Sequence, residues 1–260
     1  RQTLVAQTLN PYLQQLTYTS PLDFLPPPFS ESTFDWHFVA SPRVVVTHAN
    51  DTFLAAAVRA EVYTAAGAHD PNASLPMMPD PTSSTLRMAT LELSEYPFNT
   101  ALWSFFVRGA LSYTVLPAML PPAARGMLNT ANYRKLMPKL FAAFPDHNMT
   151  LVVRAAACPR LTIASGKLTL SGPIDLAFQV IANQSRRVFA FDLRDDRFAT
   201  TVNLSATNGP PPAIRGAIDM VDLKLTAGRS AFGELGLVLL AQLSQPVSYT
   251  HLTLPTMLMV

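Results

Sequence analysis

The sequence predicts an α+β fold in which a long, curved, barrel-like antiparallel sheet wraps around helices. Residues beyond about 149 read as short strands separated by turn residues, and two short apolar helical stripes precede them. The chain has 260 residues, of which 49% are hydrophobic and 14% are charged. This composition is sufficient for a sizeable buried core. We also expect part of a second sheet and the remnant of an N-terminal helix before the main sheet.

The first part of the chain predicts one helix and two strands. Apolar residues recur three or four positions apart over 2–16, which indicates an amphipathic helix. Strands are expected at about 34–46 and 52–63, joined by a polar turn at 48–51. Residues 64–83 are rich in Pro, Ser and Thr, which is typical of a linker.

The segment after the linker predicts a strand at 86–93 and then a helix at 94–109. Ser94 suits the N-cap, and Pro97 suits the first turn of that helix. Its apolar residues form one stripe, consisting of Phe98, Ala101, Leu102, Phe105 and Phe106. A strand at 113–120 and a short helix at 138–144 are expected next.

The remaining pattern predicts a series of strands. The expected ranges are 149–157, 161–164, 168–170, 174–181, 188–193, 198–205 and 214–225. Phe189, Phe191 and Leu193 alternate with smaller or polar residues, as in a half-buried strand. Asp195-Asp196 is predicted to be a hairpin tip. An amphipathic helix is predicted to begin near Ser230.

Basic residues gather near that predicted hairpin, at Arg186, Arg187, Arg194 and Arg197. Two interpretations stay open, namely an ordinary solvated surface and a contact with anionic lipid headgroups. Elsewhere the Lys and Arg residues are scattered and the net charge is only +2, so we expect no nucleic-acid partner.

The single cysteine, Cys158, excludes a disulfide scaffold within this chain and any multi-cysteine metal site. We expect its side chain to be a small buried apolar group, with a partner outside this sequence as the alternative. We expect that the sequence is a fragment that lacks native residues at both ends. Residues 247–260 resemble the translated adapter of a sequencing library and are predicted to be a non-native tail, the alternative being a genuine strand at 249–254.

Five Asn-x-Ser/Thr triplets occur where chance predicts about 1.6. They begin at Asn50, Asn72, Asn148, Asn183 and Asn203. Each lies in an expected loop or at a polar strand position, where a glycan could be accommodated. The set predicts a secreted, extracellular glycoprotein.

The sequence contains no motif for an activated nucleophile, a phosphate-binding loop, a dinucleotide site or a zinc protease. The histidines before the tail do not have metal-ligand spacing. The adjacent pairs His69-Asp70 and Asp146-His147 would point apart in an extended chain. We therefore predict no catalytic residue, no metal and no cofactor, and no enzymatic activity.

The motif Ser-x-Tyr-x-Phe-Asn-Thr at 94–100, followed by Trp103 and Phe106, resembles the start of the C-terminal barrel of a known family. This is the bactericidal/permeability-increasing and lipopolysaccharide-binding protein family. Residues 136–145 are similar to the next short helix of that barrel, and the strands at 161–178 follow in the family's order.

The resemblance implies a division of the chain, because the family fold joins two helix-wrapped barrels through a central sheet. Residues 52–63 resemble a strand of the central sheet, and 1–16 the last helix of the N-terminal barrel. The implied parts are the end of the N-terminal barrel (1–30), central-sheet strands (31–63), the linker (64–83), a truncated C-terminal lipid-binding barrel (84–246) and the tail (247–260).

The resemblance also implies a function, which is to hold phospholipid or lipopolysaccharide acyl chains in an apolar pocket and to transfer lipid, in innate defence. A transient membrane or lipid-particle surface is a further expected partner, with a bound phospholipid as ligand. The expected lipid-contact residues are Leu9, Leu13, Leu16, Phe98, Leu102, Trp103, Phe105, Phe106, Leu136, Leu140, Phe141 and Phe144. The alternative is a non-catalytic recognition or opsonin-type domain with a filled core that acts through its surface.

Overall fold

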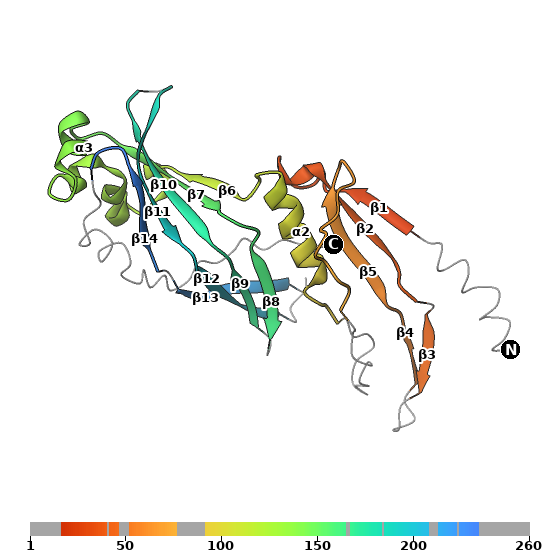
Figure 1. Cartoon of the computed structure of the whole chain (residues 1–260). Coiled ribbons are helices and arrows are strands. Elements are labelled where there is room, and N and C mark those ends of the chain that lie inside the picture. Colours follow the sequence, from red (N-terminus) through yellow and green to blue (C-terminus); the bar gives the residue numbers. More distant parts are fainter. Residues whose placement is uncertain are drawn as a thin grey trace. The chain divides into compact units, whose positions relative to one another are not determined.

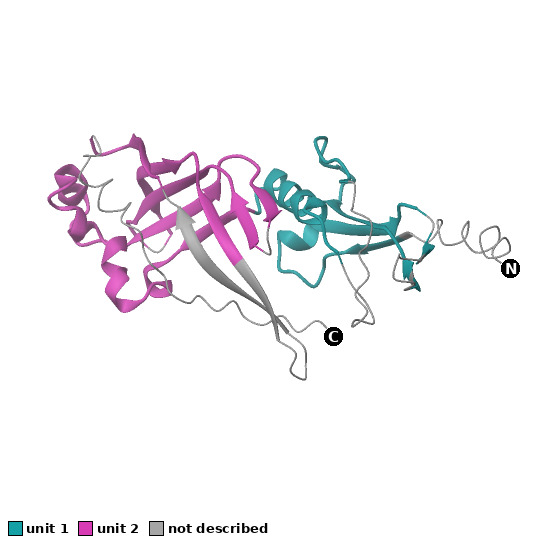
Figure 2. Ribbon diagram, turned by 90° about the horizontal axis from the view of Figure 1, so that it is seen from below, with its two compact units in different colours: residues 1–110 teal, residues 111–260 magenta. Residues whose placement is uncertain are grey.

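A computed structural model of the chain (Figure 1) describes residues 17–40, 42–46, 52–76, 92–164, 167–183, 185–207, 213–222 and 224–233. The chain divides into two compact units, residues 1–110 and residues 111–260, which Figure 2 shows in different colours. Within the described residues, no helix is long and apolar enough to cross a membrane.

The first unit contains a three-stranded antiparallel sheet in the order β1-β2-β5. These strands are β1 (Thr17–Pro21), β2 (Ser32–Phe38) and β5 (Val58–Thr64). A separate two-stranded sheet pairs β3 (Arg43–Val46) with β4 (Thr52–Ala55). Each strand expected at 34–46 and 52–63 is therefore two strands. Pro42 lies at the first break, where it cannot donate a ladder hydrogen bond.

The three-stranded sheet has two faces of opposite character. The pairs Phe34 with Val62, Trp36 with Ala60, and Phe38 with Val58 lie on one face. The pairs Thr33 with Tyr63, Asp35 with Glu61, and His37 with Arg59 lie on the other. The strict alternation of β2 and β5 thus separates an apolar and aromatic face from a face that carries Asp35, His37, Arg59 and Glu61 together with Tyr63.

The second unit contains two antiparallel sheets. The five-stranded sheet has the order β14-β11-β10-β7-β6, with β6 (Ser112–Val115), β7 (Met149–Ala155), β10 (Ile174–Ile181), β11 (Arg187–Asp195) and β14 (Thr226–Ser230). The four-stranded sheet has the order β13-β12-β9-β8, with β8 (Arg160–Ala164), β9 (Lys167–Ser171), β12 (Ala199–Thr207) and β13 (Ala213–Asp222).

The chain crosses between these sheets after β7, β9, β11 and β13, and two of these crossings show how the residues form a corner. One is at Gly172, where an added Cβ would lie 2.9 Å from the Pro159 Cα, so the close backbone approach requires glycine. The other is at Asp195-Asp196, between β11 and β12, which belong to different sheets. The prediction of a hairpin tip at Asp195-Asp196 is therefore wrong, because β11 and β12 do not pair with each other. The Asp195 carboxylate is buried because it accepts hydrogen bonds from the backbone N–H groups of Arg197 (2.8 Å) and Lys224 (2.5 Å).

The main core of the second unit lies on one face of the five-stranded sheet, under short helices. Its centre is a stack of Phe178 on Phe191, whose ring centroids are 4.5 Å apart, with Tyr133 against both rings. The covering helices are η2 (Pro117–Met119), η3 (Pro122–Leu128), η4 (Thr130–Tyr133) and α3 (Pro138–Ala143). Buried core residues are Leu128, Tyr133, Met137, Leu140, Met149, Leu176, Phe178, Val180, Ala190, Phe191 and Leu193.

A β-bulge in β11 moves one residue to the face of the sheet opposite to the expected one. Phe178 pairs with Phe191, but the next residue, Gln179, pairs with Phe189, so Ala190 is the extra residue. Phe191 and Leu193 are buried, as their alternation predicts. Phe189 instead lies on the opposite face, where the guanidinium of Arg229 is 5.7 Å from its ring centroid.

Most expected elements are confirmed, and the fold is α+β with antiparallel sheets. The helix expected at 94–109 is α2 (Tyr96–Val107), and the short helix at 138–144 is α3. The strand expected at 113–120 ends at Val115, because Pro117, Pro121 and Pro122 favour short 3-10 turns there. The strand at 214–225 is wrong in extent, since β13 ends at Asp222 and β14 begins at Thr226.

Three further expectations concern residues at the margins of the described structure. Ser230 ends β14 rather than opening a helix, and residues after 233 lie outside the described residues. The helix at 2–16 and most of the strand at 86–93 also lie outside them. Residues 65–76, in the expected linker, form turns and extended coil.

Candidate functional site

Helix α2 contacts, through a polar stripe, the edge of β5 that pairs with no other strand among the described residues. Tyr96, Thr100 and Ser104, spaced four residues apart, are its buried residues. The Thr100 hydroxyl accepts a hydrogen bond from the Val62 backbone N–H (3.1 Å), and the Ser104 hydroxyl lies 2.8 Å from that of Ser32. The Thr100 hydroxyl thus provides an acceptor for an N–H group at the sheet edge, and Ser104 joins the helix to the first residue of β2.

The apolar stripe of α2 points the other way. At 3.6 residues per turn, Phe98, Leu102, Phe105 and Phe106 lie on the side of the helix opposite the buried polar stripe. All four are half-buried, as is Trp103. The ring of Phe105 packs edge-on against Phe29, with centroids 4.9 Å apart. The sequence correctly groups these residues on one stripe, but the three-stranded sheet is contacted by the hydroxyl side of the helix.

This arrangement makes Thr100 a direct test of the helix–edge contact. Thr100→Val keeps the side-chain shape but leaves the buried Val62 N–H without its acceptor. We expect the free energy of unfolding to fall by about 1–3 kcal/mol, with faster hydrogen exchange at the Val62 amide. The control Thr114→Val, at an exposed position on β6, should change stability by less than about 0.5 kcal/mol. Unchanged protection of the Val62 amide would contradict the assigned contact.

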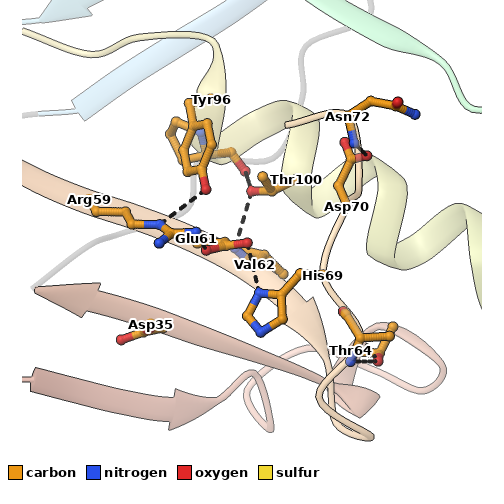
Figure 3. A network of polar contacts seen from close by, with 12 residues as sticks. Asp35, Arg59, Glu61, Val62, Thr64, His69, Asp70, Asn72, Tyr96 and Thr100 are labelled. Atoms are coloured by element: carbon orange, nitrogen blue, oxygen red, sulfur yellow. Dashed lines mark hydrogen bonds and ion pairs between the residues drawn. The ribbon is translucent and has the colours of Figure 1, made fainter. Parts of the chain in front are cut away.

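A buried ionic network lies beside α2 on the polar face of the sheet (Figure 3). Glu61, with 2% of its side chain exposed, forms an ion pair with Arg59 and contacts the Nδ1 of His69 at 2.9 Å. The His69 ring also stacks on Tyr63, with centroids 4.5 Å apart. The network therefore holds the turn after β5 against the sheet and leaves each Glu61 oxygen with a cationic or N–H partner.

Tyr96 joins this network from α2, since the Nε of Arg59 donates to its hydroxyl at 3.1 Å (Figure 3). Burial lowers the pKa of Arg59, but the hydrogen bond with Tyr96 and the attraction of Glu61 outweigh burial and raise the pKa above its usual value. Burial raises the pKa of Tyr96. Arg59 thus stays charged and Tyr96 stays neutral throughout the physiological range.

Sequence reasoning missed this network. The available signal was Arg-x-Glu within an otherwise apolar strand, which places both charges on one face. Asp35 lies directly across the ladder from Glu61, and its carboxylate is 3.7 Å from His37. The pair His69-Asp70 does point apart as expected, because Asp70 accepts from the Asn72 N–H instead. Among the described residues no group of three His, Cys, Asp or Glu side chains could hold a metal ion.

The second set of expected lipid-contact residues lies in the other unit and forms part of its core. Leu140 is fully buried, and Leu136 and Phe144 pack against the core cluster. Phe141 is half-buried, with the Arg134 guanidinium 5.2 Å from its ring centroid. Protein side chains already surround Leu140, so it cannot line a lipid pocket, whereas the role of Leu136, Phe141 and Phe144 stays a prediction. Leu9, Leu13 and Leu16 lie outside the described residues.

A surface depression of about 470 Å³ in the second unit has a different lining. It lies among η2, η3, η4 and the turn before β7, and its lining combines polar side chains with a larger share of apolar surface. They are Pro117, Ala118, Arg125, Gly126, Asn129, Ala131, Asn132, Asp146 and Asn148. None of the expected lipid-contact residues is among them, so this depression is a separate feature.

Comparison with known proteins supports the resemblance. Residues 30–255 match the model of the LBP / BPI / CETP family, C-terminal domain. The chain belongs to this family. The match includes the expected linker and continues into residues 247–255, within the expected tail.

Several curated members of the family are similar to the chain. It is 28% identical to the lipopolysaccharide-binding protein of Rattus norvegicus over 189 residues, which are 73% of this chain and 37% of that protein. The corresponding protein of Mus musculus is 26% identical over 224 residues, covering 85% and 44%. The bactericidal permeability-increasing protein of Rattus norvegicus is 26% identical over 182 residues, covering 70% and 35%. The chain thus spans less than half the length of these relatives.

Among solved structures, a crystal structure of lipopolysaccharide binding protein matches with a TM-score of 0.44 and 22% identity. The match covers 93% of this chain and 49% of that chain.

Two sequence expectations need correction in this family member. Cys158 is exposed rather than buried, and its Sγ lies 3.5 Å from the Pro159 carbonyl oxygen. The expected patch of four arginines is not continuous, because Arg187 and Arg194 lie at opposite ends of β11. Arg194 is also paired with Asp196 (2.6 Å), which neutralises part of the charge.

The expected glycosylation sites can be placed individually. Asn72, Asn148 and Asn183 are exposed, as attachment of a glycan requires. Asn203 lies in β12, and Asn50 lies outside the described residues. Glycosylation at all five stays a prediction.

Proposed function

We propose that the chain is part of a secreted, non-catalytic protein that binds and transfers phospholipid or lipopolysaccharide in innate defence. The observation that carries the proposal is the orientation of α2. A helix with a single apolar stripe normally buries that stripe against its own sheet. Here the hydroxyl side contacts β5, and Phe98, Leu102 and Phe106 remain half-buried on the opposite side, where they can contact acyl chains.

The energetics of acyl-chain burial favour this interpretation. Each CH₂ group removed from water contributes about 0.8 kcal/mol, so two long acyl chains provide ample driving force without polar contacts. Headgroup selectivity is therefore expected to be weak. The relatives support the ligand class, because they are named for lipopolysaccharide binding and for increasing bacterial permeability. An extracellular location and transient contact with membrane or lipid-particle surfaces are part of the same proposal.

Non-catalytic action is supported by the way the titratable groups are used. The most deeply buried carboxylates, Glu61 and Asp195, each hold a structural contact, with Arg59 and with backbone N–H groups respectively. Exposed arginines such as Arg154 and Arg229 pair with Asp175 and Asp192. This pairing argues against a nucleic-acid surface. We infer that no cofactor is needed beyond the bound lipid.

The test is lipid binding by a variant of the outward stripe. Leu102→Asp with Phe106→Asp places two carboxylates where acyl carbons would lie. We expect affinity for a fluorescent phospholipid to fall at least tenfold, because each side chain contributes roughly 1.5–3 kcal/mol when buried and about 1.4 kcal/mol corresponds to a tenfold change. The control Leu54→Asp changes an apolar residue of the same unit that is already 71% exposed and should bind normally.

Native mass spectrometry of the wild-type chain provides the complementary measurement. A lipid adduct that is lost in the double variant would support the proposal, provided the circular dichroism spectrum is unchanged. Equal binding by the variant and the control would reject α2 as the lipid site. The absence of any lipid and of any phospholipid binding would favour the alternative recognition domain, which the packing of Leu140 and Phe144 in a filled core also supports.

A further inference from the structure

The surface depression of the second unit contains one of the predicted glycosylation sites. Asn148 is the last residue before β7, and it lines the depression together with Arg125, Asn129, Asn132 and Asp146. A sugar attached to Asn148 would therefore begin at the wall of this depression. Asn72 and Asn183, which are also exposed, are not among its lining residues.

The Asn148 side chain is held in place by its neighbours. The Nδ2 of Asn129 donates to the Oδ1 of Asn148 at 3.4 Å, and the Oδ1 of Asn129 accepts from the Ala131 N–H at 2.7 Å. The two asparagines also form an isolated antiparallel bridge. These contacts use the oxygen of the Asn148 amide, whereas a glycan is attached to its nitrogen. Attachment would therefore leave the contact with Asn129 intact.

The lining offers the groups that a saccharide needs. Carboxylate, amide and guanidinium groups can hydrogen-bond sugar hydroxyl and acetamido groups, and Pro117 provides apolar surface for a ring face. The turn that carries Asp146 has an uncommon backbone, with φ of 52° at Asp146. It is fixed by a pair of contacts between Thr130 and His147, at 2.9 Å and 2.8 Å.

A second observation comes from Thr150, the hydroxyl residue of the same triplet. Its side chain is 1% exposed, and within the described part of the chain its Oγ1 has no hydrogen-bond partner. A buried hydroxyl without a partner costs about 1–3 kcal/mol, and valine would occupy the same volume without this cost. The Thr150 hydroxyl therefore makes no stabilising hydrogen bond in the described structure, whereas the Asn-x-Ser/Thr acceptor requires a hydroxyl at this position.

We propose that Asn148 carries an N-linked glycan whose first sugars rest in the depression lined by Arg125, Asn129, Asn132 and Asp146. Attachment joins the Nδ2 of Asn148 to C1 of an N-acetylglucosamine. The amide nitrogen loses one proton, and the donor, an oligosaccharide diphospholipid, loses its lipid diphosphate as the leaving group. The inference rests on the secretory route in the proposed function and is independent of lipid binding at α2.

The first experiment measures whether Asn148 carries a glycan and whether the depression protects that glycan from release. The chain is secreted from a glycosylating host, and glycopeptides of the native protein are followed during digestion with a peptide-N-glycosidase. We expect Asn148 to be occupied and its glycan to be released at least tenfold more slowly than those at Asn72 and Asn183, with equal release after denaturation. Arg125→Ala with Asn132→Ala, outside the triplet, should bring release at Asn148 to the rate at Asn72.

The second experiment uses Thr150→Val in two hosts. In a bacterium, which adds no glycan, the variant should have a melting temperature equal to or above that of the wild type, because only an unpartnered hydroxyl is lost. In the glycosylating host it should melt below the wild type, because the seated glycan is lost. If Thr150→Val produced in the bacterium melts clearly below the wild type, the Thr150 hydroxyl does stabilise the fold and this interpretation is overturned.

The outcomes separate this inference from the proposed function. Occupancy at Asn72 or Asn183 with none at Asn148 would overturn the inference and leave the secretory route intact. If the glycan at Asn148 is released as fast as the glycan at Asn72, its first sugars do not rest in the depression. If no triplet is occupied, both the inference and the secretory route fail, while phospholipid binding by the α2 stripe is still measured independently.

Discussion

Replacing Arg59 with methionine is expected to lower the free energy of unfolding of the first unit by about 3 kcal/mol. Removing one partner of a buried ion pair leaves an uncompensated charge, which typically costs 3–5 kcal/mol. Glu61 is only 2% exposed, so it cannot regain water when Arg59 is lost, and the half-exposed His69 is its other partner. Urea unfolding, with hydrogen exchange followed in β2 and β5, measures the effect.

The matched control is Arg154→Met. Arg154 pairs with Asp175 at 2.9 Å but is 53% exposed, and exposed pairs contribute at most about 1 kcal/mol. Adding Glu61→Leu to Arg59→Met should recover part of the lost stability, because no buried charge is then left. If Arg59→Met and Arg154→Met have equally small effects, Glu61 does not depend on Arg59, and the network has been assigned wrongly.

Phe191→Ala is expected to destabilise the second unit by about 4 kcal/mol, the typical cost of removing a buried phenylalanine side chain. Phe191 is fully buried and stacks on Phe178, with Tyr133 also in contact. Its loss would leave a cavity in the centre of the core beneath α3 and η4. Thermal and urea unfolding, with hydrogen exchange in β7, β10 and β11, measure the change.

Tyr113→Ala, on β6 of the same sheet, is the control for that substitution. Tyr113 is 62% exposed, so truncation should cost less than about 1 kcal/mol. A loss at Phe191 no larger than that at Tyr113 would mean that the Phe178–Phe191 stack is not the centre of the core.

Local periodicity was sufficient to predict most elements of this chain. Helices α2 and α3 and the strands from β7 to β12 follow from repeats of 3.6 and 2 residues and from turn residues between them. The buried side of β11 could be predicted only in part. Phe191 and Leu193 are buried as expected, but the bulge at Ala190 moves Phe189 to the other face. A bulge is set by pairing with β10, which the sequence of β11 does not contain.

The residues of the candidate site were likewise predictable only in part. The sequence groups Phe98, Leu102, Phe105 and Phe106 correctly on one stripe of α2. It does not reveal that the hydroxyl groups of Thr100 and Ser104 contact β5 and β2, because these contacts depend on strands that lie far away in the sequence. It also assigns Leu140 to a lipid wall, whereas the structure places this residue in the core with Phe178 and Phe191.

By itself, the sequence determined the fold class, the periodic elements, the family and the positions of the Asn-x-Ser/Thr triplets. These properties depend on residues close together in the chain, or on motifs whose order can be compared with that of relatives. The tertiary structure alone decided which strands share a sheet, which side of α2 contacts β5, and that Glu61 is buried with Arg59 and His69. It also decided that Asn148 borders a depression. Each of these depends on contacts between distant segments, whose geometry follows from the packing of the whole unit and leaves no periodic signal in the sequence.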